Sequence, residues 1–141
     1  MDSCSKMDYS KIKGFVNDNV NFASANHIRL TRAELDHAEG ELTVVPESLN
    51  PFGNVHGGCL ATLADIVGGA TVRSRGRHCV TMNCTLNYLR AATGSRIRGV
   101  GDMVRYGRTV AVCDITLLNE QDEKVAVGTF TYYIRDKEFE V

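Results

Sequence analysis

The sequence predicts an α+β fold in which an antiparallel sheet of five to six strands wraps around one long central helix. Three observations lead to this prediction. One apolar segment, about residues 56–74, repeats its large side chains at three- and four-residue steps, which is the period of a helix. The segments after it alternate polar and apolar residues, which is the period of a half-buried strand. The connections between these strands are short, and short connections favour antiparallel pairing.

Several elements are expected before the central helix. A short amphipathic helix is expected at about residues 8–19, where apolar side chains recur at helical spacing. Two extended segments follow, about 26–35 and 40–46, with a hairpin loop at 37–40 between them. Residues 46–54 contain both prolines of the chain and several polar turn formers, so this stretch is expected to be a loop.

The central helix is unusual because two adjacent glycines, Gly68 and Gly69, lie near its middle. Each costs about 1 kcal/mol relative to alanine in a helix interior. The pair therefore predicts that another part of the protein packs closely against this surface. After the helix, four strands are expected at about residues 81–88, 96–105, 109–118 and 124–135.

Length and charge limit the classes of function. A chain of 141 residues fits a single domain, residues 1–141, with one core. A formal net charge of −1 provides no general attraction for nucleic acid. The first 13 residues have no apolar core, and no apolar run approaches the roughly 18 residues of a membrane span. We therefore expect a cytoplasmic protein that binds neither nucleic acid nor membranes.

The cysteines and histidines show no metal-binding spacing. The cysteines are odd in number and form no Cys-x-x-Cys pair: Cys4, Cys59, Cys79, Cys84 and Cys113. Three of them lie in apolar segments, which is typical of small buried side chains in a reducing compartment. Cys59 has no base beside it in the sequence, so core packing is expected rather than a nucleophilic role. No metal is expected.

Asp65 is the most informative polar residue, because it lies in the middle of the most apolar helix of the chain. A carboxylate there needs a partner or a cleft, since burial without either carries a large desolvation cost. A structural salt bridge or hydrogen bond is one interpretation. The other is that Asp65 faces a cleft and acts as a base or a nucleophile.

The start of the same helix reads His56-Gly57-Gly58. Backbone N–H groups at a helix start lack intrahelical partners, and glycines let a ligand approach them. Such groups can hold a carbonyl oxygen or an oxyanion, although an ordinary helix-entry turn is the alternative interpretation. His56 and Asp65 are nine residues apart, so they lie roughly 13–14 Å apart along the axis and on opposite faces. If both belong to one site, a second copy of the chain must contribute one of them, which predicts a site at a two-fold dimer interface.

The stretch from Asn50 to Asp65, with His56-Gly57-Gly58 followed by Leu63-Ala64-Asp65, resembles the hotdog-fold acyl-CoA thioesterases. It is most similar to the phenylacetic-acid-pathway thioesterases and the thioesterase superfamily member proteins. The resemblance extends from about residue 27 to residue 134. It implies hydrolysis of an acyl-CoA thioester to a free acid and CoA, with no cofactor apart from the CoA of the substrate. It also implies a homo-oligomer with a dimer as its minimal unit and a tetramer as the expected assembly.

The resemblance also implies roles for single residues. Asp65 would attack the thioester or activate the water that does so, and the Gly57 N–H of the other subunit would polarise the thioester carbonyl. Asn50 and His56 match positions that shape the pocket. Thr81 matches a Ser/Thr position that orients the water.

Gly58 and three arginines complete the expected substrate site. Gly58 would allow close approach of the substrate, and Arg90, Arg105 and Arg108 would bind the CoA phosphates, although each arginine has a solvated surface charge as its alternative. The basic run at residues 73–78 is interpreted as favourable charge at a helix C-terminus.

Two other classes of function remain open from the sequence. A hotdog hydratase or dehydratase would also use a carboxylate and a histidine on acyl thioesters, but no second hydratase-type motif is present. A non-catalytic acyl-CoA-binding sensor on the same fold would usually lack the carboxylate, which this chain retains at Asp65. Hydrolysis is therefore the favoured prediction.

Overall fold

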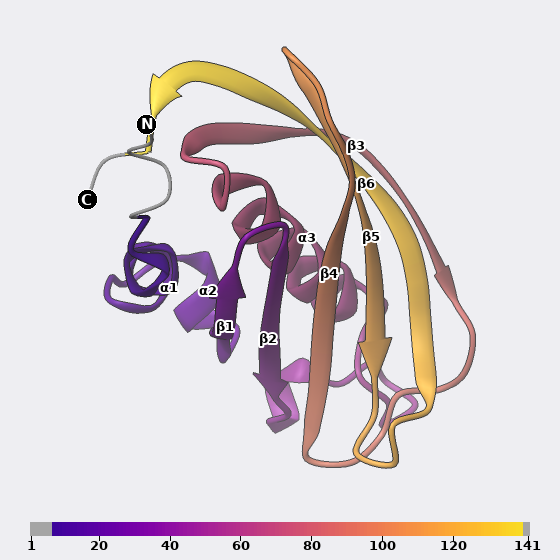
Figure 1. The fold of residues 1–141 in the computed structure, drawn as a ribbon. Coiled ribbons are helices and arrows are strands. Elements are labelled where there is room, and N and C mark those ends of the chain that lie inside the picture. The colour runs from indigo at the N-terminus through magenta and orange to yellow at the C-terminus, as the bar shows by residue number, and fades with distance from the viewer. Residues whose placement is uncertain (1–6, 140–141) are drawn as a thin grey trace.

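The computed structural model describes residues 7–139, which form one antiparallel sheet around a central helix (Figure 1). The six strands have the order β1-β2-β4-β5-β6-β3, and every neighbouring pair is antiparallel. The sheet curves around helix α3, which confirms the predicted α+β class. The elements along the chain are α1 (Tyr9–Asn17), α2 (Phe22–Ala25), β1 (Ile28–Glu34), β2 (His37–Thr43), the 3-10 helix η2 (Pro46–Ser48), α3 (Gly57–Arg73), β3 (Arg77–Tyr88), β4 (Arg96–Tyr106), β5 (Val110–Leu118) and β6 (Lys124–Glu138).

Helix α3 is buried because its apolar side chains pack into the concave face of the sheet. Leu63 and Val67 are fully buried. Two glycines on the facing strands, Gly40 and Gly99, make room for this contact. A Cβ atom on either would lie 3.1–3.2 Å from a side-chain carbon of Val67, so the helix rests directly on the strand backbone. No helix within residues 7–139 is long and apolar enough to cross a membrane.

The predicted hairpin loop at residues 37–40 is wrong. These residues belong to β2, and the chain turns at Leu35 and Asp36, where Asp36 adopts a positive φ of 62°. Aspartate tolerates this conformation better than most residues, so the turn needs no glycine. The apparent loop residues alternate between partly exposed and buried positions, which is strand periodicity. The short helix α2 was also not predicted.

Candidate active site

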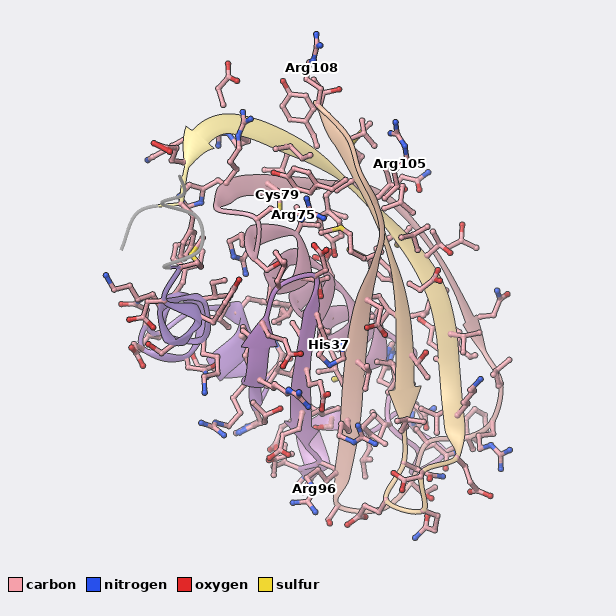
Figure 2. The ribbon with its side chains drawn as sticks, viewed as in Figure 1. His37, Arg75, Cys79, Arg96, Arg105 and Arg108 are labelled. Carbon is pink, nitrogen blue, oxygen red and sulfur yellow. The ribbon has the colours of Figure 1, made fainter. Side chains whose placement is uncertain are left out.

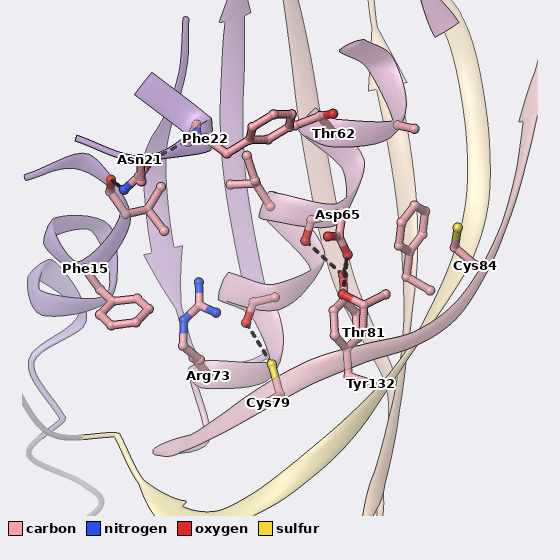
Figure 3. A pocket seen from close by; sticks show the side chains of 16 residues that line it. Phe15, Asn21, Phe22, Thr62, Asp65, Arg73, Cys79, Thr81, Cys84 and Tyr132 are labelled. Carbon is pink, nitrogen blue, oxygen red and sulfur yellow. Dashed lines mark hydrogen bonds between the residues drawn. The ribbon is translucent and has the colours of Figure 1, made fainter. Parts of the chain in front are cut away.

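A cavity of about 700 Å³ lies beside the middle of α3 (Figure 3). One stripe of the helix lines it, and its members recur at three- and four-residue steps that place them on one face. The opposite walls come from β3, β6 and the segment containing α1 and α2. The helix residues of this stripe are Ala61, Thr62, Asp65, Ile66, Gly69 and Arg73. Asp65 therefore faces a cleft, as one of its two interpretations required.

Two hydroxyl groups hold one oxygen of the Asp65 carboxylate. Thr81 Oγ1 donates to Asp65 Oδ1 at 2.7 Å, and the Tyr132 hydroxyl lies 3.1 Å from the same oxygen. The Tyr132 hydroxyl also lies 2.9 Å from the backbone oxygen of Asp65. Asp65 forms no ion pair with residues 7–139, and its Oδ2 accepts no hydrogen bond from them. The carboxylate is thus oriented through Oδ1, which leaves Oδ2 available for chemistry.

Tyr132 is a site residue that the sequence analysis missed. Its ring is almost fully buried, and burial raises the pKa of its phenol well above the ordinary value, so the hydroxyl stays protonated and donates. A Cβ atom on Gly68 would collide with this hydroxyl. The prediction that the adjacent glycines mark a close approach is therefore confirmed at Gly68. The sequence feature that could have identified Tyr132 is its hydroxyl, which stands among the apolar, inward-facing residues of the last predicted strand.

The start of α3 has a second set of predicted residues, away from the cavity. His56 caps the helix, and its Nδ1 accepts a hydrogen bond from Gly58 N at 2.8 Å. The N–H of Gly57 has no acceptor among residues 7–139, so it is free to bind a ligand oxygen. Tyr88 lies against Gly57 and donates from its hydroxyl to the Gly57 carbonyl at 3.0 Å.

Asn50 stabilises the loop that leads into the helix. Its Oδ1 accepts hydrogen bonds from the backbone nitrogens of Phe52 at 2.9 Å and Asn54 at 3.1 Å. The structure therefore brings Asp65 and Thr81 together within one chain. It places Asn50, His56 and the two glycines at or just before the start of the helix, outside the Asp65 cavity.

The three arginines predicted to bind CoA do not gather in one copy. Arg90 contacts Glu123 at 3.2 Å, in the turn that follows β5. Arg105 and Arg108 are exposed near the turn that precedes β5 (Figure 2). Nine residues of β5 separate these turns, which corresponds to about 30 Å. Any site that uses all three must combine two copies of the chain.

Three of the four cysteines described have thiols that are less acidic than a free thiol, which is the opposite of an activated nucleophile. Burial raises the pKa of the Cys59 and Cys79 thiols, and it raises the pKa of Cys113 to about 12. Cys59 packs against the core, as predicted. Cys4 lies outside the described residues. Within residues 7–139, no group of three or more His, Cys, Asp or Glu side chains could hold a metal ion.

Comparison with known proteins identifies the family. Residues 52–126 match the family model of the thioesterase superfamily, which is more than half of the chain. This chain belongs to the thioesterase superfamily. The resemblance inferred from the residues around Asp65 is thereby confirmed, as is the prediction of a thioester hydrolase.

Two relatives illustrate the match. The Escherichia coli acyl-coenzyme A thioesterase PaaI is 31% identical over 87 residues, which cover 61% of this chain and 62% of PaaI. The structure of E. coli PaaI covers 94% of this chain and 96% of its own, with a TM-score of 0.87 at 23% identity, and confirms the hotdog fold. A Streptococcus mutans protein solved with acetyl CoA is 30% identical, covers 88% of this chain and 98% of its own, and has a TM-score of 0.79.

A third neighbour is a hypothetical thioesterase from Streptococcus pneumoniae solved with coenzyme A. It is 32% identical, covers 80% of this chain and 91% of its own, and has a TM-score of 0.75. Two further structures of that protein are variants in which alanine replaces an aspartate or a threonine sixteen residues later. Asp65 and Thr81 have the same separation of 16 residues in this chain.

Proposed function

We propose that this member of the thioesterase superfamily hydrolyses an acyl-CoA thioester to a free acid and CoA, with Asp65 as the acting carboxylate. The observation that carries the proposal is the Asp65 carboxylate at the cavity wall, oriented through Oδ1 by Thr81 and Tyr132. A carboxylate held in one orientation loses little freedom when it reacts. The aspartate–threonine separation shared with the S. pneumoniae thioesterase supports the same pair.

In this proposal the free Oδ2 acts on the thioester carbonyl, either directly or through a water molecule. The Gly57 N–H of a second copy polarises the carbonyl oxygen, because donors aimed at that oxygen stabilise the charge that develops on it. His56, Gly58 and Asn50 shape this half of the site. In the water route, Asp65 takes a proton from the water as its oxygen bonds to the carbonyl carbon, the C–S bond breaks, and the proton passes to the CoA sulfur. In the direct route, Oδ2 bonds to the carbonyl carbon and the C–S bond breaks, which leaves an anhydride on Asp65; a water then cleaves this anhydride, giving the acid and restoring Asp65, and its proton leaves with the CoA thiol.

An exposed edge strand supports assembly through two copies. β3 forms one edge of the sheet, and eight of its 12 residues are exposed. Val80 and Met82, near its middle, are apolar and about half exposed. A long edge strand with apolar side chains is a template for pairing with another chain. We propose that two copies join their sheets along β3, and that a tetramer is built from such dimers.

Two-fold pairing along β3 would complete the site. Strands related by a two-fold axis perpendicular to the sheet pair antiparallel, so the end of β3 in one copy lies beside the beginning of β3 in the other. Tyr88 at the end of β3 holds Gly57, and Thr81 near its beginning holds Asp65. The pairing therefore moves Gly57 of one copy toward Asp65 of the other. It also moves Arg90 of one copy toward the end of the sheet that has Arg105 and Arg108, where the CoA phosphates would bind.

The test is free-thiol release from a panel of aromatic and straight-chain acyl-CoAs. Wild type should hydrolyse members of the panel, and Asp65→Asn should lower kcat/KM by about 10³-fold, or about 4 kcal/mol of transition-state stabilisation. Asp114→Asn is the matched control. Asp114 also accepts a hydrogen bond from a threonine, Thr129, at 3.4 Å, but it is exposed on β5 outside the cavity. The Asp114→Asn variant should therefore be as active as wild type.

Each result has a defined meaning. If Asp65→Asn keeps most of the activity, the role of Asp65 is wrong even though the family is right. If wild type binds acyl-CoAs without releasing thiol, the protein is a binding module and the proposed hydrolysis is wrong.

A further inference from the structure

Arg73 differs from the other arginines near the end of α3. Arg75 pairs with Asp36 at 2.7 Å, and Arg77 pairs with Asp136 at 2.9 Å. Arg73 forms no ion pair with residues 7–139, and its buried Nε has no hydrogen-bond acceptor. It is the member of the basic run that enters the cavity, so the interpretation of this run as simple helix-end charge does not describe it.

The guanidinium of Arg73 is held at the cavity wall by neutral groups. Phe15 lies against one face, with the Arg73 Cζ atom 5.1 Å from the ring centroid. A Cβ atom on Gly69 would lie 3.2 Å from Arg73 Nη1, so the absence of a side chain there lets Arg73 fold back along the helix. Figure 3 shows the side chain between Phe15 and Cys79. Burial lowers the pKa of the guanidinium, although Cys79, Tyr132 and Asp65 oppose this shift.

The buried Nε of Arg73 without an acceptor is costly, because hydrogen-bonding groups removed from water need partners. The group that best satisfies it is a carboxylate, whose two oxygens match the fork of the guanidinium. Asp65 does not supply it, since neither oxygen of that carboxylate lies within ion-pair distance of Arg73, and the bonds from Thr81 and Tyr132 orient the carboxylate through Oδ1. An occupant of the cavity remains as the source.

We propose that Arg73 binds a carboxylate at the far end of the acyl group, so that the preferred substrates are CoA thioesters of short dicarboxylic acids. This inference rests on the proposed function, because it takes the cavity beside Asp65 as the acyl pocket. The guanidinium folds back over Gly69, one helical turn or about 6 Å along the axis from Asp65. A thioester carbonyl at Asp65 and a carboxylate at Arg73 are therefore joined by a short carbon chain. Ile66 and Phe22 provide apolar wall for that chain.

The test compares adipyl-CoA with hexanoyl-CoA, which have the same chain length and differ in the terminal carboxylate. Wild type should prefer adipyl-CoA by at least tenfold in kcat/KM, and Arg73→Met should remove the preference, lowering the ratio by at least tenfold to about 1. Arg73→Lys should keep part of the preference for adipyl-CoA, because lysine retains the positive charge but lacks the two parallel N–H donors of the guanidinium. Arg75→Met is the matched control, since Arg75 is paired with Asp36 outside the cavity, and it should leave the ratio unchanged.

A binding measurement separates this inference from the proposed hydrolysis. Titration calorimetry with free adipate and free hexanoate should show adipate binding to wild type and its loss in Arg73→Met, whether or not thiol is released. Equal adipate binding by the two proteins, or an unchanged adipyl to hexanoyl ratio in Arg73→Met, overturns the inference even if wild type is an active thioesterase. Absence of thiol release with intact adipate binding overturns only the proposed hydrolysis.

Discussion

The two edges of the sheet differ in how they are covered: the β1 edge is capped by a side chain of the same protein, and the β3 edge is exposed. At the β1 edge, the Asn17 side chain donates to the Leu30 carbonyl at 2.8 Å and accepts from the Leu30 N–H at 2.9 Å. This amide takes the place of a neighbouring strand, and helix α1 packs beside it. The β3 edge is exposed over most of its length. Edges without a partner are usually blocked against aggregation, so the open edge marks where a second copy is expected.

The two edges also differ in their charged residues. Beside the β1 edge, titratable groups pair within and between strands: His37 contacts Glu39 on its own strand, β2, and Asp102 on β4, each at 2.7 Å. The middle of β3 contains no charged residue between His78 and Tyr88. Its Thr81 reaches the site carboxylate. In the proposed dimer, function and assembly share the β3 edge, whereas the contacts at the β1 edge stabilise the single chain.

Of the variants at the two sheet edges, a charge at the centre of β3 should have the largest effect. We expect Met82→Lys to convert the oligomer to monomers and to lower thioesterase activity by at least about 10²-fold. The reason is that two lysines would face each other across the two-fold axis, and the Gly57 N–H of the second copy would be lost. Sedimentation velocity and thiol release on the same samples measure both effects.

Thr31→Lys is the control for this variant, because Thr31 is an exposed residue of the β1 edge. It should keep both the oligomer and the activity. A monomeric Met82→Lys with full activity would show that one copy forms a complete site. It would contradict the proposal that pairing along β3 completes the active site.

A change at the blocked edge should affect stability alone. Asn17→Ala leaves the Leu30 N–H and carbonyl without their partners in a partly buried position. We expect the free energy of unfolding to fall by about 1–3 kcal/mol, measured by urea denaturation. Oligomeric state and kcat should stay at wild-type values. A new, larger assembly of Asn17→Ala would instead show that this amide mainly prevents pairing at β1.

The smallest effect concerns pH. Burial opposes the charge on His37, but its hydrogen bonds to Glu39 and Asp102 outweigh burial and raise its pKa. A group whose pKa is raised by folding stabilises the protein fully below its unfolded pKa, about 6.5, and the gain is lost as pH rises through the folded pKa.

The expected stability advantage of wild type over His37→Gln is therefore about 0.5 kcal/mol near pH 6 and fades toward higher pH. Urea denaturation of the two proteins at several pH values measures it. An advantage that grows with pH would contradict the assignment.

The local pattern of the chain was sufficient for the helix and for one member of the site. The predicted helix at residues 56–74 and the observed α3, Gly57–Arg73, differ by only one residue at each end. The agreement is close because helical periodicity depends on residues that are near one another in the sequence. Asp65 was found for the same reason, since a carboxylate in an apolar helix contrasts with its own surroundings. The turn at Asp36 was missed, because an aspartate at positive φ is harder to recognise than a glycine.

Contacts between distant segments were decided only when the sheet closed around the helix. Tyr132 lies 67 residues after Asp65 in the sequence, and it reaches the carboxylate because β6 has a register that turns Tyr132 inward. A slip of one residue would point it to the other face. Arg73 was interpreted as part of a run of favourable charge at a helix C-terminus, and the cavity around it is built by residues of α1, α2, α3, β3 and β6 together. Sequence periodicity shows which face of each element is buried, but only packing sets which buried groups meet.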